Sequence, residues 1–495
     1  MPAYYLEALT VTLGIALLML EAFVPLASKK IVGISAAAGL AFILILSFFA
    51  IGPDAKPAAA WAKWELWNFY QYDSLARFYK GFALVCTIFV VLMSVDFRSI
   101  LARFTDEPGT EKGTGEYYAL PVFACAGMMW MASAKDLAGA FVALELVTIT
   151  FYILVSYLRR NVGSLEAGVK YLILGALSTG FLVYGIAWIY GATGTMNLAE
   201  IGARLVPLGH GAVSQPSLLF GIALILIALG FKIGAVPMQV WIPDVYQGAP
   251  TPTTAFLSVG SKAAGFILLI RFLTPFMQPD SPVAAKVTLM LAIMAGATLI
   301  YGNLAAIAQT NFKRLLAYSS IAHAGFLVLA LAAWSETSAA FLSSANTVSF
   351  YLATYLLMTL ASFFILAQIR IQDGSEEIDA FNGLGKRNPV LALGLTVIMA
   401  ALAGVPLTAG FIGKFLVFYL AAQAGLWWGI VLAAIGAAAG FYYYFKIIRA
   451  VWWEAPKADA KPLVLPQITR YCVVGLTVAV IVIGVWPEPV WMLLQ

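Results

Sequence analysis

Long apolar runs recur along the whole chain and are separated by short polar segments. A run of roughly 20 apolar residues is long enough to cross the hydrocarbon core of a bilayer as a helix. The pattern predicts fourteen such spans, at 5–26, 31–52, 76–95, 118–134, 138–158, 166–191, 217–236, 253–275, 284–306, 314–334, 348–370, 389–424 (one interrupted span), 427–449 and 468–490. The sequence therefore predicts an all-α polytopic membrane protein without a soluble domain.

Composition agrees with this prediction, because 62% of the 495 residues are hydrophobic and 11% are charged. Such values exclude an ordinary soluble protein. The cysteines Cys86, Cys125 and Cys472 are isolated and form no CxxC motif, so neither a disulfide framework nor an iron–sulfur site is indicated. His210 falls in a predicted outer loop, which leaves one core histidine, His323, and no pair of haem ligands. We expect no cofactor in this chain.

The distribution of basic residues predicts the orientation. Loops after odd-numbered spans carry seventeen Lys and Arg residues, against eight in loops after even-numbered spans. The positive-inside rule then places the odd loops in the cytoplasm and both termini on the periplasmic side. The net charge of +5 reflects this asymmetry and requires no nucleic-acid partner.

The flanks of the spans agree with a membrane-embedded chain. Lys29 and Lys30 follow the first span and no basic residue precedes it, so this span reads as a retained helix and not as a cleaved signal peptide. The absence of a transit peptide favours a bacterial plasma (inner) membrane. Aromatic residues near span ends, including Tyr442 to Tyr444, are expected in interfacial belts.

A few ionisable residues fall inside the predicted spans. Once the residues near span ends are counted with the loops, they are Lys170, Lys232, Lys262, Lys414 and Glu145. Each costs about 2.5 to 3.5 kcal/mol at mid-helix, so residues of this kind are functional candidates by default. Lys170 lies about one turn inside its span, where an extended side chain that reaches the headgroups is an equally good explanation.

The residue types point to proton exchange. A buried lysine can release its proton, whereas arginine cannot. His323, beside Ser319 and Ser320, could pass a proton between neighbours near neutral pH, although a hydrogen-bonded core histidine is the alternative. Glu145 could tune a lysine or merely neutralise it, and His210 is expected to have no role.

Two helix interruptions accompany two of these lysines. Pro237 follows Gly-Ala-Val five residues after Lys232, and Pro406 follows Gly-Val eight residues before Lys414. Paired interruptions of this kind indicate inverted repeats with sites at the breaks, although proline kinks are also common in membrane helices. The offsets between matching residues, 169 to 182, align spans four to eight with nine to thirteen.

The expected organisation follows from this repeat. We predict a three-helix segment at 1–117, a five-helix repeat at 118–275, a second, inverted repeat at 284–452, and a C-terminal helix at 453–495.

Three longer motifs resemble a known family. They are VYQGAPTPTTAFLSVGSKAAGF (245–266), FKRLLAYSSIAHAGF (312–326) and LAGVPLTAGFIGKF (402–415), and they are similar to the antiporter-like membrane subunits of respiratory complex I, the proton-pumping NADH:quinone oxidoreductase. Lys414 in the second broken helix and an end shortly after the last span resemble the N-type subunits. The M-type would carry glutamate at position 414, and the L-type would continue into a lateral helix.

The resemblance implies a role for each residue. Glu145 would pair with Lys232, Lys262 would relay protons, His323 would lie in a central axis, and Lys414 would lie toward the outer exit. Lys170 matches a lysine of N-type subunits.

The resemblance also implies partners. FMN, iron–sulfur clusters and quinone would belong to other subunits of the complex. The chain would contact the lipid bilayer, a neighbouring antiporter-like subunit and the small membrane subunits beside it, and would move protons as quinone is reduced elsewhere.

Two other functions remain open from the residues. One is an Mrp-type Na⁺/H⁺ antiporter subunit, although sodium prefers several oxygen ligands and the core offers one carboxylate. The other is an inert membrane scaffold whose polar groups have no role.

Overall fold

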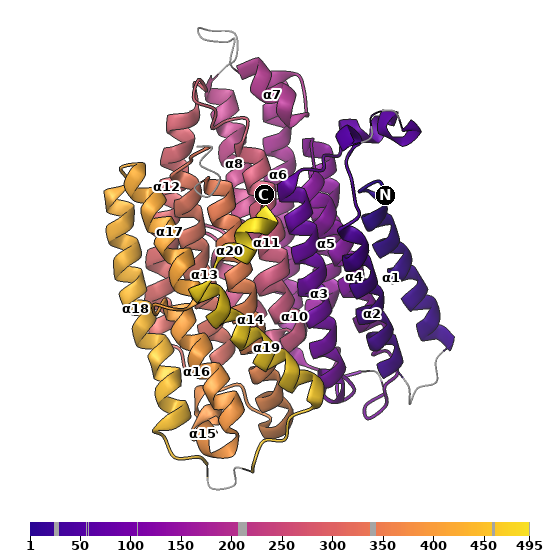
Figure 1. Ribbon diagram of the computed structural model, residues 1–495, viewed down its shortest axis with the longest axis vertical. Coiled ribbons are helices and arrows are strands. Elements are labelled where there is room, and N and C mark those ends of the chain that lie inside the picture. Colours follow the sequence, from indigo (N-terminus) through magenta and orange to yellow (C-terminus); the bar gives the residue numbers. More distant parts are fainter. Residues whose placement is uncertain are drawn as a thin grey trace.

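The chain forms a bundle of long helices that run roughly along the long axis of the molecule (Figure 1). The computed structural model describes all residues except 24–28, 56, 58, 106, 206–214, 337–342, 458–460 and 495. His210 therefore lies outside the described residues. Apart from isolated β-bridges, the regular structure of the described part is helical.

The first half of the chain contains the following helices: α1 (Tyr5–Phe23), α2 (Lys30–Ser47), the short turns η2 (Pro53–Ala55), η3 (Ala60–Lys63) and η4 (Glu65–Asn68), α3 (Ser74–Leu101), α4 (Glu116–Ser133), α5 (Leu137–Val155), α6 (Val162–Thr193), α7 (Leu198–Leu205), α8 (Gln215–Ile233), η6 (Gln239–Trp241), α9 (Ile242–Gly248), α10 (Thr251–Phe256), the π-helical turn η7 (Leu257–Ser261) and α11 (Lys262–Leu273).

The second half contains α12 (Ala284–Ile307), α13 (Phe312–Ala332), α14 (Ser344–Asp373), η8 (Ile378–Phe381), α15 (Leu384–Arg387), α16 (Pro389–Ala403), α17 (Ala409–Gln423), α18 (Trp427–Trp452), α19 (Gln467–Val485) and α20 (Glu488–Leu494). Helices α7 and α15 mark opposite ends of the bundle in Figure 1, and we call these the α7 end and the α15 end.

The predicted all-helical membrane fold is confirmed. In the described part of the chain, twelve helices are long and apolar enough to cross a membrane. They correspond to twelve of the predicted spans, while span 118–134 corresponds to α4 and the interrupted span 389–424 to α16 and α17. The total of fourteen spans and the repeat boundaries stay predictions.

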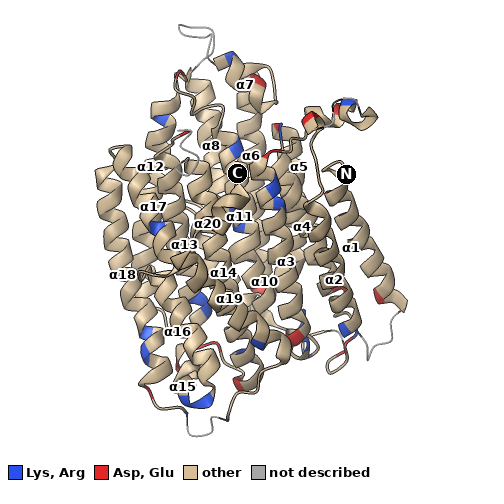
Figure 2. Cartoon of the chain, in the orientation of Figure 1, with Lys and Arg blue, Asp and Glu red and all other residues tan. Residues whose placement is uncertain are grey.

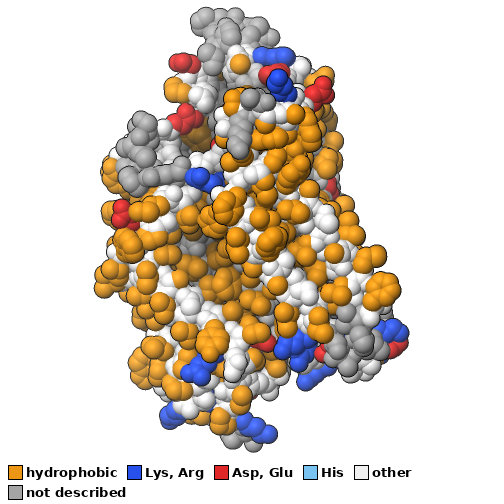
Figure 3. All heavy atoms as spheres, turned by 45° about the vertical axis from the view of Figure 1, so that its right-hand side comes forward, with side chains coloured by type: hydrophobic (Ala, Val, Ile, Leu, Met, Phe, Trp, Pro, Cys, Tyr) orange, Lys and Arg blue, Asp and Glu red, His pale blue; other side chains and the backbone are white. Residues whose placement is uncertain are grey.

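Charge and apolar surface are arranged as a bilayer requires. Charged side chains gather toward the two ends of the bundle (Figure 2), and the middle of the face in Figure 3 is largely hydrophobic. Large apolar side chains such as Ile15, Phe42, Ile173 and Leu393 are exposed on the bundle surface. An apolar surface of this extent fits contact with lipid or with other membrane subunits.

The most deeply buried helices lie at the centre of the bundle. Helix α13 and the continuous helix Thr251–Leu273 are buried along their whole apolar windows. The second of these contains the π-helical turn immediately before Lys262. Turns of this type are frequent at functional sites, and this one changes the helical phase just where the lysine begins the next segment.

A buried ion pair joins the first and third helices. Lys80 is 0% exposed and Glu7 is 5% exposed. The Lys80 ammonium contacts a Glu7 carboxylate oxygen and donates to the Tyr70 hydroxyl at 2.8 Å. Sequence reasoning missed this pair, because both residues lie near the ends of their predicted spans, where loop chemistry is expected.

A second ion pair ties the beginning of α3 to the last turn of α11. Arg271 donates from both terminal nitrogens to the two Asp73 oxygens at 2.6 Å, and Asp73 also caps α3 by accepting from the Ala76 amide at 2.8 Å. Burial alone would raise the pKa of Asp73, but the hydrogen bonds and charge of Arg271 outweigh burial and hold this pKa below its ordinary value.

This ion pair makes stability depend on pH. Its contribution is complete above the ordinary aspartate pKa of about 3.9 and is lost as pH falls through the lowered pKa. We expect the melting temperature in detergent to fall less between pH 7 and pH 3 in Asp73→Asn than in the unmodified chain, because asparagine keeps the cap but cannot be neutralised. Equal losses in the two proteins would contradict this assignment.

Candidate proton-transfer site

The two helix interruptions are built alike. Gly234 follows α8 with φ +78°, and Gly404 follows α16 with φ +94°. This left-handed backbone favours glycine. At both places a Cβ would also collide with a neighbour, Ile242 in the first break and the Lys414 side chain, at 3.0 Å from Cδ, in the second. The breaks therefore need glycine for conformation and for space.

Lys414 satisfies the end of the second broken helix. Its ammonium donates to the carbonyl oxygens of Leu402 and Ala403, both at 2.8 Å. These carbonyls belong to the last turn of α16, where the break removes the helical donors that would otherwise reach them. A cation is also favoured at a helix C-terminus. The position of Lys414 thus follows from the interruption itself.

Lys232 lies in the last turn of α8, just before the first break. Its ammonium donates to the Thr148 hydroxyl on α5 at 2.9 Å and lies 5.9 Å from the centre of the Phe151 ring. In the same break, the freed amide of Val236 donates to the Thr298 hydroxyl at 3.0 Å. Backbone that leaves the helix inside the bundle is thereby satisfied by protein.

Glu145 is near Lys232 but is bonded elsewhere. Its carboxylate accepts from the Thr179 hydroxyl at 2.8 Å, and the described structure contains no ion pair between Glu145 and Lys232. A cavity of about 10 Å³, lined among others by Thr148, Thr179 and Lys232, lies between the two hydrogen bonds. This volume suits about one water molecule. Glu145 and Lys232 are therefore apart in this structure, an arrangement that we call open.

Lys262 connects the middle of the bundle to α13. Its ammonium donates to the Ser320 carbonyl at 2.6 Å and contacts the Ser320 hydroxyl. That hydroxyl lies 3.3 Å from the Tyr246 hydroxyl. Lys232 packs close by, since a Cβ on Gly265, one turn after Lys262, would lie 3.1 Å from its Cγ.

His323 lies between two tyrosines. Its Nδ1 is 2.7 Å from the Tyr351 hydroxyl and its Nε2 is 3.1 Å from the Tyr444 hydroxyl. It follows Ser320 by three residues on α13, so both side chains lie on one face of that helix. A cavity of about 10 Å³, again enough for about one water, is lined by His323 and Lys414.

Sequence reasoning named Ser319 and Ser320 but missed the other hydroxyl groups of this site, and for two tyrosines it was wrong. Tyr443 and Tyr444 are 2% and 1% exposed and lie inside α18, whereas the expected interfacial belt holds only for Tyr442, which is 63% exposed. A usable signal existed. Thr148 lies three residues after Glu145, and Ser320 lies three residues before His323. This spacing places each hydroxyl on the same helix face as its titratable neighbour.

Lys170 stands apart from the other candidates. Its half-exposed side chain pairs with Glu166 at 2.7 Å and with Asp244 at 2.8 Å, toward the α15 end. The structure thus brings Lys232, Lys262, His323 and Lys414 into one buried zone with Glu145 beside it, and it places Lys170 at the mouth of a separate cavity. Pro237 and Pro406 lie within the two breaks.

This zone gathers side chains that can accept and release protons. Amines, an imidazole and hydroxyls alternate, and hydroxyls can donate and accept at once. No group of three His, Cys, Asp or Glu side chains that could hold a metal ion occurs in the described residues. A helical membrane bundle with two interruptions and such a row defines an antiporter-like ion-translocating subunit.

Comparison with known proteins agrees with this class. Residues 134–440 match the family described as NADH:quinone oxidoreductase/Mrp antiporter, TM. NADH-quinone oxidoreductase subunit N of Heliobacterium modesticaldum is 37% identical over 484 residues, which cover 98% of this chain and 96% of the relative. The chain belongs to this family and, within it, to the N-type subunits of NADH-quinone oxidoreductase.

Solved structures extend the likeness to three dimensions. A chain of respiratory complex I from Thermus thermophilus, solved with bound aureothin, has a TM-score of 0.77 and 32% identity, with 98% of both chains covered. A chain of the Mrp complex from Dietzia sp. has a TM-score of 0.80 at 19% identity, covering 99% of this chain and 96% of that chain. The second likeness concerns the fold alone.

Proposed function

We propose that this proton-translocating subunit moves protons from the cytoplasm to the outside along Glu145, Lys232, Lys262, His323 and Lys414. The observation that carries the proposal is that four buried groups able to accept and release protons, Lys232, Lys262, His323 and Lys414, lie in one zone with half-buried Glu145 beside it, each bonded to a hydroxyl or a carbonyl. FMN, iron–sulfur clusters and quinone belong to partner subunits, and quinone reduction there drives the transfer. Pro237 and Pro406 maintain the breaks that hold Lys232 and Lys414.

The switch is the pair formed by Glu145 and Lys232. When the carboxylate approaches the ammonium, it favours the charged form of the lysine; when it moves away, the buried ammonium is less favourable and its proton passes toward Lys262. The open arrangement, with Thr148 and Thr179 as alternative partners, supports two positions for the pair. Moving one charge against 100 mV costs about 2.3 kcal/mol, which a modest change in pairing can supply.

The orientation completes the proposal. The positive-inside rule makes the α15 end cytoplasmic and puts both termini on the periplasmic side of a bacterial inner membrane. A neighbouring antiporter-like subunit and the small subunits beside it cover part of the apolar surface. Half-buried Glu145, next to exposed Val142 and Leu146 on α5, supports a partner at this face, because a carboxylate facing lipid is costly.

Replacing Lys232 by alanine tests the axis. We expect proton transfer by the assembled complex in vesicles to fall by about tenfold or more, because a buried proton carrier contributes at least this much, and Glu145→Ala to reduce it as well. The measurement is the initial rate of vesicle acidification, with quinone reduction followed in parallel. Unchanged rates of both in a well-assembled Lys232→Ala complex would contradict the proposal and support an inert scaffold.

An Mrp-type Na⁺/H⁺ exchange is the second candidate, favoured by the shared fold. Sodium is a hard cation and prefers oxygen ligands, and the described axis offers one carboxylate among amines and hydroxyls. We therefore expect transport that does not depend on sodium. Vesicle acidification that requires sodium would favour Na⁺/H⁺ exchange over the proposed proton path.

A further inference from the structure

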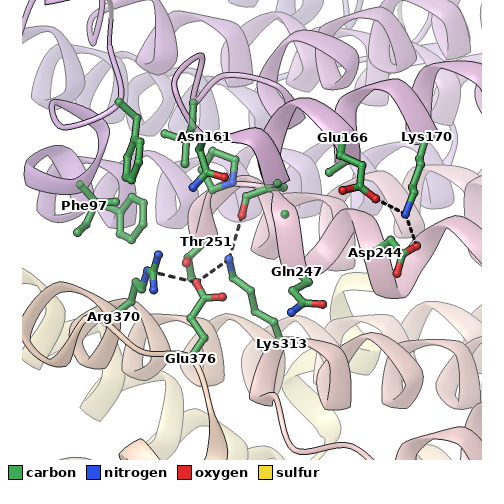
Figure 4. Close-up of a pocket in the computed structure, with 18 residues that line it drawn as sticks. Phe97, Asn161, Glu166, Lys170, Asp244, Gln247, Thr251, Lys313, Arg370 and Glu376 are labelled. Atoms are coloured by element: carbon green, nitrogen blue, oxygen red, sulfur yellow. Dashed lines mark hydrogen bonds and ion pairs between the residues drawn. The ribbon is translucent and has the colours of Figure 1, made fainter. Parts of the chain in front are cut away.

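A cavity of about 320 Å³ opens between α6, α9, α10 and α13 at the α15 end (Figure 4). Six charged side chains line it, three of each sign: Glu166, Lys170, Asp244, Lys313, Arg370 and Glu376. A balanced set of charges does not select an anion or a cation. It suits a volume of water, and the cavity is large enough for several molecules.

The cavity becomes more buried from one side to the other. Figure 4 shows Glu166, Lys170 and Asp244 on one side and the cluster of Lys313, Glu376 and Arg370 on the other. The first group is 38% to 60% exposed, whereas the Lys313 side chain is 3% exposed. Water and protons can thus pass from an open rim to a buried inner wall.

Thr251 lies at the inner wall of the cavity, and the proposed proton path described above does not include it. It is 0% exposed, and its hydroxyl has no hydrogen-bond partner within the described structure. An unpaired buried hydroxyl is costly and calls for an unseen partner. Because Thr251 lines the cavity, water that enters the cavity can reach this hydroxyl.

Buried hydroxyls continue from Thr251 to the axis. Thr254, Ser258 and Lys262 follow it at intervals of three, four and four residues along the continuous helix Thr251–Leu273, which contains the π-helical turn Leu257–Ser261. Each is at most 2% exposed. The Thr254 hydroxyl donates to the Tyr246 carbonyl at 3.0 Å. The Tyr246 hydroxyl lies 3.3 Å from the Ser320 hydroxyl, which contacts the Lys262 ammonium.

The buried pair of Lys313 and Glu376 holds the segment that carries Thr251. The Lys313 ammonium lies 2.8 Å from a Glu376 oxygen and donates to the carbonyl of Ala249 at 2.9 Å. Ala249 precedes Thr251 by two residues, so this ammonium fixes the connection between α9 and α10. Arg370, at 3.7 Å, is a second cation for Glu376.

We propose that Thr251 is the first buried proton acceptor on the uptake side of this subunit, and that Lys313 and Glu376 are its positioning residues. The Thr251 hydroxyl takes a proton from water in the cavity as it gives its own proton to a bridging water on the inner side. Bridging water and the Ser258 hydroxyl pass the proton on in the same way to Lys262, which accepts it as the neutral amine. This inference rests on the proposed function and adds the entrance of the proton path.

Thr251→Val removes the hydroxyl and nearly keeps the shape. We expect the initial rate of proton transfer by the assembled complex in vesicles to fall about fivefold, because the free energy of one hydrogen bond corresponds to a rate ratio of this size. Thr251→Ser should restore the rate. Thr10→Val is the matched control, because Thr10 is also fully buried and its hydroxyl donates only to the carbonyl of Leu6 at 2.7 Å.

Lys262→Ala in the same vesicles separates the two proposals. Loss of transfer in Lys262→Ala with normal transfer in Thr251→Val would overturn the entrance alone. Normal transfer in Lys262→Ala would overturn the proposed function.

Thiol labelling tests the cavity without relying on transport. We expect Thr251→Cys to react with a charged, membrane-impermeant thiol reagent at least about tenfold faster than Thr10→Cys, because a buried thiol without water is inert. Lys313→Gln should change the labelling rate at position 251, whereas Lys457→Gln, which breaks the exposed pair with Asp379, should not. Equal labelling of both cysteines, or no effect of Lys313→Gln, would overturn the inference.

Discussion

Lys414→Met is expected to reduce proton transfer by the assembled complex at least about a hundredfold, because the last titratable amine of the axis is removed. Stability should fall too. The carbonyl oxygens of Leu402 and Ala403 lose their donor, and each unsatisfied group costs about 1 to 3 kcal/mol.

Lys414→Arg separates the two roles of this residue. Arginine can donate to the same carbonyls but does not release its proton. We therefore expect Lys414→Arg to recover part of the melting temperature lost in Lys414→Met and none of the proton transfer. The measurements are vesicle acidification and thermal unfolding in detergent. Normal proton transfer in Lys414→Arg would show that this position need not exchange a proton.

Breaking the ion pair of Glu7 and Lys80 is expected to give the largest change in stability. Lys80→Met leaves the Glu7 carboxylate buried without its partner, which costs about 3 to 5 kcal/mol. The double variant Glu7→Gln and Lys80→Met removes both charges and should recover most of this loss, since an uncharged pair of similar volume carries no desolvation cost.

Unfolding of the purified protein in detergent measures these differences. The control is Lys457→Met, whose pair with Asp379 is exposed on both sides and should contribute about 1 kcal/mol or less. A Lys80→Met chain as stable as this control would mean that Glu7 finds another partner or takes up a proton. A double variant no more stable than Lys80→Met would contradict the pairwise account.

The sequence predicted the kind of residues in the site better than their contacts. Lys232, Lys262 and Lys414 stand out because a charge inside an apolar run is visible without a structure. Their partners do not stand out, because Thr148, Ser320 and the carbonyls of α16 come from other helices or across a break. The expected ion pair of Glu145 with Lys232 does not occur in the described structure, where Glu145 accepts from Thr179 and Lys232 donates to Thr148.

Position near a span end was the main source of error. Lys80, Glu7 and Lys313 lie where a loop or headgroup environment is expected, and all three are buried. Tyr444 was predicted at an interface because it stands near the end of a predicted span, yet it bonds His323 in the core. A hydropathy pattern indicates where a residue lies along its own span. It does not indicate burial, because burial depends on which other helices pack around that span.

By itself, the sequence determined the membrane class, the two interruptions and three of the buried lysines, Lys232, Lys262 and Lys414. These follow from local physics, since each depends on the cost of placing a residue or a break in hydrocarbon. Only the tertiary structure decided which hydroxyls join the lysines, that Lys170 stands outside their zone, and that a cavity reaches Thr251. Those outcomes depend on contacts between helices far apart in the chain, and hydrophobic periodicity carries no information about them.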